Sequence, residues 1–219
     1  PNLEFPVKSP VHEEFTTGYA TLDTLEDGNA YGELLLQLID IRESKQSIDV
    51  PEKQKIPQKV CRFVMTPKGE MEQYSGPQKE TYVLVRLIFG VPFHKLKLSQ
   101  VRVYPFKVYT GNDETNSPII GQISHEFKSI ENLDGKAFAK ILTTIDLKDQ
   151  SPGNSVKNIE WKGTGESLFS INNSQLETSK WQLARKKILI PPDEESPNMI
   201  VEIFDIGIKN EKTKGSAKK

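Results

Sequence analysis

Apolar and polar residues alternate along much of the chain, which is the period of a β-strand. Several short runs of this kind are rich in β-branched and aromatic residues: 59–65, 118–127, 155–162, 166–171, 186–191 and 199–208. The segment QVRVYPFKVY has the same alternation. It is expected to place Val101, Val103 and Pro105 on one side of a strand, and Arg102, Tyr104 and Phe106 on the other.

Clusters of Gly, Pro, Ser, Asn and Asp separate these runs, as in TGNDETNSP, DQSPGNS and PPDEESPN. The short GTG of Gly163–Gly165 is interpreted as another turn, because it leads into a strand and not into a helix. Many short strands joined by polar turns predict a mainly β chain. We expect an antiparallel β-sandwich or a barrel-like domain.

Helical patterns are few, and we expect one or two short helices. Residues 131–147 begin with an Asn/Asp-rich stretch and place Phe138, Ile141 and Leu142 on one helical face, although their second half also fits a strand. Residues 172–187 have loose helical spacing. The longest apolar runs, 33–41 and 82–91, have the length of core strands and fall short of the roughly 18 residues that cross a bilayer.

The chain is expected to form a single β-rich domain over residues 1–208. An extended N-terminal segment (1–16) contains three prolines, and residues 43–58 form a polar loop. Alternatively, 43–58 or 111–118 separates two subdomains. Residues 209–219 contain five lysines and one glutamate, and are expected to form a flexible basic tail.

Charge and cysteine content narrow the function classes. The 29 basic and 30 acidic residues give a net charge of −1, whereas dedicated nucleic-acid binders carry a positive excess. Cys61 is the only cysteine, which excludes an internal disulfide and a cysteine-based zinc site. The first residues do not resemble a secretory signal, so a reducing, cytoplasmic compartment is the simplest expectation. We expect no cofactor and no metal ion.

A basic, aromatic segment spans residues 82–109, and no acid occurs between Thr81 and Gly111. If 82–91 and 101–109 form a hairpin, the second strand presents cations and rings on one face, as in proteins that bind single-stranded nucleic acid. A core hairpin with exposed basic residues is the favoured explanation of the segment, and an interface with another protein or another copy is a further alternative. The residues expected to contact nucleic acid or another anionic partner are Arg86, Lys95, Lys97, Arg102, Tyr104, Phe106 and Lys107.

Catalytic motifs are scarce. The chain has no HExxH and no GxSxG sequence, and Cys61 lies in a strand-like run where cysteine is usually inert. One pattern is similar to that of metal-dependent nucleases of the restriction-enzyme type, in which carboxylates hold Mg²⁺ and a lysine acts on the attacking water. It consists of Asp146, Asp149, Glu160 and Lys162. The common residue types make this the weaker alternative.

The sequence therefore favours a non-enzymatic structural, assembly or protein-interaction role. The expected partners are other protein subunits, in a homo-oligomer or a larger assembly, and not a membrane. A module for single-stranded nucleic acid is the first alternative, and a Mg²⁺-dependent nuclease is the second.

Overall fold

The computed structural model describes residues 11–25, 29–43, 46–56, 58–66, 71–76, 79–89, 96–108, 118–149, 156–172, 175–189 and 198–210. The strands are β1 (Val11–Thr24), β2 (Ala30–Glu43), β3 (Gln46–Ile48), β4 (Gln58–Met65), β5 (Met71–Ser75), β6 (Val101–Val108), β7 (Ile119–Leu133), β8 (Lys136–Asp149), β9 (Val156–Ser170), β10 (Leu176–Leu189) and β11 (Asn198–Asn210). One α-helix, α1 (Lys79–Phe89), and one 3-10 turn, η1 (Glu52–Gln54), complete them. The mainly β expectation is confirmed.

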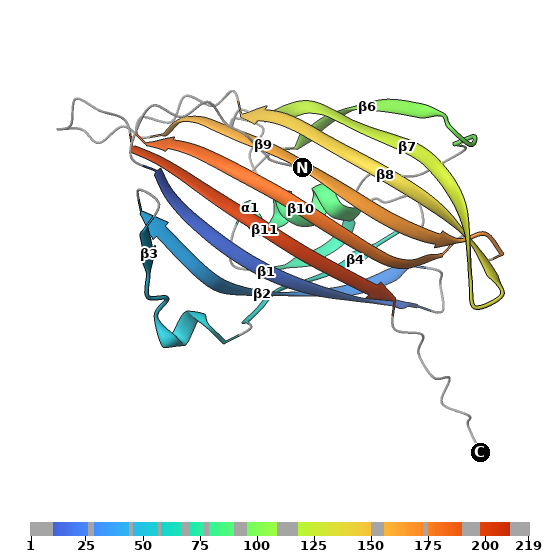
Figure 1. Ribbon diagram of the computed structural model, residues 1–219, viewed down its shortest axis with the longest axis horizontal. Coiled ribbons are helices and arrows are strands. Elements are labelled where there is room, and N and C mark those ends of the chain that lie inside the picture. The colour runs from blue at the N-terminus through green and yellow to red at the C-terminus, as the bar shows by residue number, and fades with distance from the viewer. Residues whose placement is uncertain are drawn as a thin grey trace, which may run out of the picture.

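All the described strands belong to one sheet, in the order β5-β4-β2-β1-β11-β10-β9-β8-β7-β6, with β3 paired to β2 (Figure 1). Two antiparallel meanders, β1–β5 and β6–β11, meet at a parallel pairing of β1 with β11. Among the described strands, β5 and β6 do not pair with each other, so the sheet stays open. Its outermost strands are β5 at one end and β6 at the other.

Helix α1 connects these two outermost strands in the sequence and packs against one face of the sheet, here called the inner face (Figure 1). The helix is apolar on nearly all sides: Val83, Leu84, Val85, Leu87, Ile88 and Phe89 are all buried. A helix that is apolar all round needs a surrounding core. Residues 82–91 were expected to form a strand paired with 101–109, and this prediction is wrong for the described part, 82–89.

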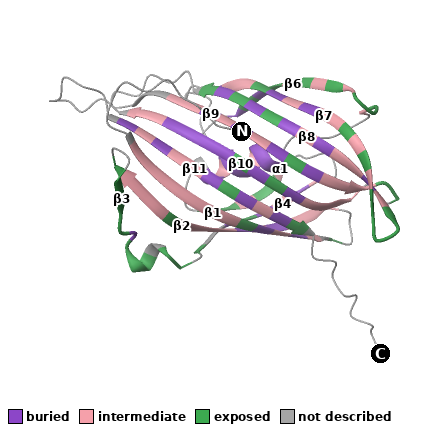
Figure 2. Ribbon diagram, viewed as in Figure 1, coloured by how far each residue is buried: buried purple, intermediate pink, exposed green. Residues whose placement is uncertain are grey.

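Buried residues recur along the strands around α1 (Figure 2). The inner face supplies the rest of the core, with Trp161 and Trp181 as its largest fully buried side chains. Glycines make room for these rings. A Cβ at Gly165 would lie 2.5 Å from the Trp181 ring, and a Cβ at Gly163 would clash with Leu183. The GTG sequence therefore lies inside β9 and is not a turn, because the large side chains of β10 need space on the neighbouring strand.

The two expected helices are also strands. Most of residues 131–147 belongs to the β7–β8 hairpin, which turns at Asp134 (φ 50°) and Gly135 (φ 73°), and most of 172–187 belongs to β10. Both positive φ angles suit the Asp-Gly turn that joins twisted antiparallel strands. In β10, Trp181, Leu183 and Arg185 alternate toward the core, so the period of two prevails over the loose helical spacing.

The structure describes the other expected segments only in part. Of the N-terminal segment 1–16, residues 11–16 are strand β1, and residues 1–10 lie outside the described residues. The polar loop 43–58 contains β3 and η1, and the strands on either side of it, β2 and β4, pair with each other. Strand β11 continues to Asn210, and 211–219 is not described. Among the described helices, none has the length and apolar character needed to cross a bilayer.

Candidate functional site

Strand β6 begins with a β-bulge, which determines which of its backbone N–H and C=O groups point toward β7 and which point to the open edge of the sheet. The N–H of Ser99 donates to the carbonyl of Phe127 at 2.7 Å, and the N–H of Phe127 donates to the carbonyl of Gln100 at 3.2 Å. Ser99 has a φ of 62°. This is the pattern of a G1 bulge, in which the first bulge residue adopts the left-handed conformation.

The position of the bulge determines which alternate residues of β6 form backbone hydrogen bonds with β7. In an antiparallel ladder, hydrogen-bonded pairs alternate with non-bonded pairs. Since Gln100 bonds toward β7, the backbone groups of Arg102, Tyr104 and Phe106 also point toward β7. Those of Val101, Val103, Pro105 and Lys107 point away from the sheet. Pro105 therefore lies where its missing N–H costs no ladder bond, as is usual for proline in edge strands.

The side chains of β6 alternate as the sequence predicts, but the open face is the apolar one. Val101 and Val103 are 56% and 55% exposed on the outer face. Phe106 is buried in the core, and Tyr104 is half-buried and packs against it. The Arg-x-Tyr-x-Phe row thus faces the inside of the molecule, because its rings belong to the core beside α1.

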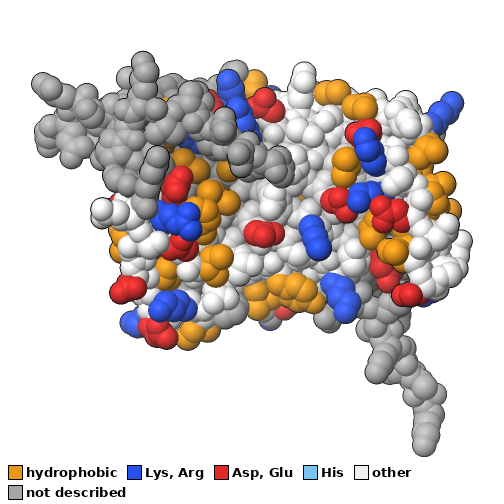
Figure 3. Space-filling view, viewed as in Figure 1, with side chains coloured by type: hydrophobic (Ala, Val, Ile, Leu, Met, Phe, Trp, Pro, Cys, Tyr) orange, Lys and Arg blue, Asp and Glu red, His pale blue; other side chains and the backbone are white. Residues whose placement is uncertain are grey.

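The other basic residues of the expected nucleic-acid surface are spread over separate places. Arg86 lies on α1, and its buried Nε has no hydrogen-bond partner among the described residues. Lys97 is exposed in the turn before β6, and Lys107 is exposed on β6 next to the buried Phe106 and Val108. Lys95 lies outside the described residues. Figure 3 shows basic and acidic side chains interspersed on one face of the molecule. Nucleic-acid binding by these residues stays a prediction.

A buried histidine lies beneath the β6 edge. His125, on β7, is the cross-strand neighbour of Arg102 and is 1% exposed. Its Nδ1 lies 2.8 Å from the Thr143 hydroxyl oxygen, and its ring lies 5.4 Å from the Tyr104 ring. Burial lowers the pKa of His125 to about 4, so the imidazole is neutral at neutral pH.

The nuclease pattern is brought partly together. Asp146 on β8 is the direct cross-strand neighbour of Lys162 on β9, and Glu160 has Lys148 and Lys186 as neighbours on either side. Alternating charges on adjacent strands stabilise a sheet without a metal ion. Asp149 pairs with Ile159. Among the described residues, no group of three or more His, Cys, Asp or Glu side chains is placed to hold a metal.

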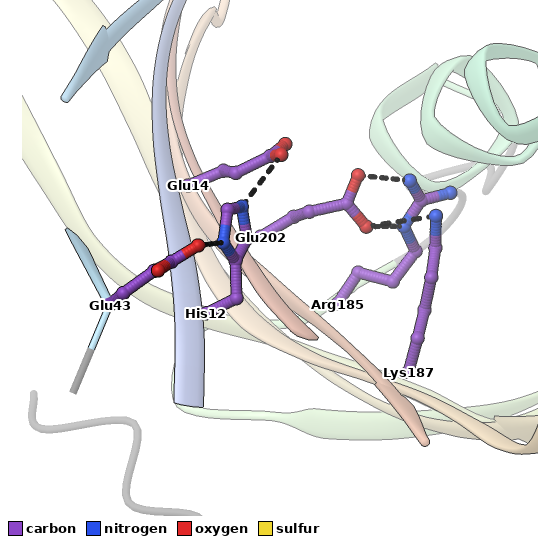
Figure 4. A network of polar contacts seen from close by, with 6 residues as sticks. All are labelled: His12, Glu14, Glu43, Arg185, Lys187 and Glu202. Carbon is purple, nitrogen blue, oxygen red and sulfur yellow. Dashed lines mark hydrogen bonds and ion pairs between the residues drawn. The ribbon is translucent and has the colours of Figure 1, made fainter. Parts of the chain in front are cut away.

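A network of charged side chains that the sequence does not reveal lies at one end of the inner face (Figure 4). Arg185 donates from Nε and Nη2 to the two carboxylate oxygens of Glu202, and the Lys187 Nζ lies 3.3 Å from the same carboxylate. His12 lies between Glu14, at 3.1 Å, and Glu43, at 3.3 Å. These groups come from β1 and β2 near one end of the sequence and from β10 and β11 near the other, so only the alternation of β10 and β11 could have indicated their shared face.

The single cysteine, Cys61, is buried on the inner face beside the Tyr74 side chain. Cys61 is 3% exposed, and burial raises its pKa to about 11. Burial, and next its neighbour Cys61, raise the pKa of Tyr74 to about 12. A neutral, buried thiol is a poor nucleophile and metal ligand. This environment fits the expectation that the Cys61 thiol is inert.

Comparison of the chain with protein-family models, with curated proteins and with solved structures finds no match.

Proposed function

We propose that the protein is a non-enzymatic assembly protein that joins protein subunits through the β6 edge. The observation that carries this proposal is the coincidence of two features on one strand. The outward N–H and C=O groups of Val101 and Val103 have no neighbouring strand among the described ones, and the same two side chains are more than half exposed. An edge with free backbone groups and β-branched side chains is a template for another strand.

The rest of the molecule supports a role for this edge. The polar network of Figure 4 consists mostly of paired charges, and the buried Cys61 is neutral. The other sheet edge, β5, is only 5 residues long, and short edge strands are a common protection against pairing. The β6 edge is thus the longer surface available for strand pairing. As part of this proposal we place assembly in the reducing cytoplasm, since Cys61 is a free thiol.

Light scattering over a dilution series tests the proposal. The mass of the wild-type protein is expected to rise above 24.8 kDa with concentration, because strand pairing is reversible. The double variant Val101→Lys/Val103→Lys is expected to stay at the monomer mass, since lysine on an edge opposes pairing. Ile39→Lys is the matched control, because Ile39 is 54% exposed on the distant strand β2. A wild-type mass of 24.8 kDa at every concentration overturns the proposal, as does a double variant that associates like wild type.

Binding of single-stranded nucleic acid is retained as a second candidate because Lys97 and Lys107 are exposed near the same strand. It would rest on charge more than on stacking, since Phe106 is in the core. Absorbance at 260 and 280 nm during the same experiment, at low and high salt, distinguishes the two candidates. Bound nucleic acid raises the 260 nm signal and is released by salt.

A further inference from the structure

We infer that the strand that pairs with β6 is the β6 strand of a second copy, antiparallel, with the two-fold axis at Tyr104. This inference rests on the proposed function and adds the partner and the register. It follows from which backbone groups of β6 face outward and which side chains meet when two such strands are placed side by side.

The backbone selects the register. Only Val101, Val103, Pro105 and Lys107 direct their groups outward, so these residues must face one another across the dimer. With the axis at Tyr104, Val101 faces Lys107 and they exchange both hydrogen bonds. Val103 faces Pro105, whose carbonyl accepts the Val103 N–H. Every outward N–H of both strands then has an acceptor, and the proline requires none.

Neighbouring registers satisfy fewer groups. An axis at Val103 places Lys107 opposite Ser99, which lies before the strand in the left-handed conformation. An axis at Pro105 places two prolines opposite each other, with no N–H between them. If the two-fold axis instead lies between two residues, each residue whose backbone groups point away from β7 faces a residue whose backbone groups point toward β7. The two strands then form no regular ladder of hydrogen bonds. The two-fold axis at Tyr104 therefore gives the register in which the longest part of β6 is paired.

The side chains also fit this register. On the outer face, Val101 lies beside Lys107 and Val103 beside Pro105, so the exposed valines gain apolar neighbours from the lysine stem and the proline ring. On the inner side, Arg102 faces Phe106 and Tyr104 faces its own copy. No like charges lie directly opposite each other, an arrangement that favours pairing.

The competing contact is β6 of one copy with β5 of the next. Such a contact uses two different surfaces and extends into a ring or an open filament. Strand β5 has 5 residues against the 8 of β6, so part of the β6 edge would remain unpaired. The exposed Glu72 on β5 is also hydrogen-bonded by Asn29. The match of lengths favours the closed dimer.

Mixed disulfide formation tests the register. In the inferred dimer, residues 101 and 107 form a hydrogen-bonded pair with Cα atoms about 5.5 Å apart, which is within the range for a disulfide. We mix Val101→Cys protein with Lys107→Cys protein, one of them carrying a removable size tag, under mild oxidation. Both positions are exposed, so the fold is retained, and the buried Cys61 does not compete. The mixture is expected to form at least tenfold more disulfide-linked heterodimer than either variant forms homodimer alone.

The outcomes separate the register from the proposed function. Equal cross-linking in the mixture and in the single variants overturns the inferred register. If wild type still associates through residues 101 and 103 in that case, the assembly function stands. A mass that grows beyond twice 24.8 kDa also overturns the closed dimer and favours the β5–β6 contact. A wild-type protein that remains monomeric removes both proposals.

Discussion

Arg185 and Glu202 face each other directly across β10 and β11 and form a two-pronged ion pair. The Arg185 guanidinium also lies 5.3 Å from the centre of the Trp161 ring. Both side chains are mostly buried, so removal of Glu202 takes away the carboxylate that faces the Arg185 guanidinium in a buried region. A buried charge without its partner is strongly destabilising.

We therefore expect Glu202→Ala to lower the free energy of unfolding by about 3 kcal/mol. Lys128→Ala, which removes an exposed pair with Glu126, is expected to change it by less than about 1 kcal/mol. Urea unfolding followed by tryptophan fluorescence measures both variants. Equal effects of the two substitutions would contradict a special role for the buried pair.

His125 makes stability depend on pH. Its pKa is about 4 in the folded protein and about 6.5 when unfolded. The unfolded chain thus binds the proton more readily. The contribution of His125 is fully present above pH 6.5 and is lost progressively as the pH falls toward 4, by roughly 3 kcal/mol in total.

The matched experiment compares wild type with His125→Gln in urea unfolding between pH 4 and pH 7. The variant is expected to lose less stability over this window than wild type, whatever its stability at pH 7. Parallel curves for the two proteins would show that His125 does not cause the acid sensitivity.

Cys61 is expected to be unreactive in the folded protein. At pH 8 the buried thiol, with its pKa of about 11, is almost entirely protonated, whereas an exposed cysteine has a pKa near 8.5. A disulfide reagent such as DTNB should label Cys61 at least a hundredfold more slowly in buffer than in concentrated urea. Rapid labelling in buffer would mean that the inner face opens often.

The glycine beneath Trp181 is expected to tolerate no side chain. Gly165→Ala places a methyl group 2.5 Å from the indole ring and should cost about 1–3 kcal/mol of stability. Gly207→Ala is the control, because a Cβ there has no atom within 4 Å and β11 continues past it. Thermal unfolding of both variants checks the difference. A neutral Gly165→Ala would mean that Trp181 moves freely.

The sequence predicts the strands well because apolar and polar residues alternate along a strand that buries one face only. Val101 and Phe106 were placed correctly on opposite sides of β6, but alternation alone does not say which side faces solvent. That choice depends on α1, which was predicted as a strand. Its residues are apolar on nearly all sides, and such a short run has no period that separates helix from strand.

The candidate site needed information that is absent from local sequence. Ser99, in the left-handed conformation, determines which backbone groups of β6 point toward β7. Glycine, and not serine, is the residue expected at such a position. The Arg185–Glu202 pair joins strands whose neighbourhood only the sheet order reveals. In contrast, the Asp134–Gly135 turn carried a hairpin signal that the helical interpretation of 131–147 overlooked.

The parallel pairing of β1 with β11 has a consequence for how the chain reaches its native state. Val11 pairs with Met199, so the first and last described strands meet at the middle of the sheet. During synthesis the β1–β5 meander emerges with one side of β1 unsatisfied until β11 is complete. Contacts between such distant residues slow folding. The protein must therefore protect a nascent edge until β11 has been synthesised, and a chain terminated before β11 would display that edge permanently.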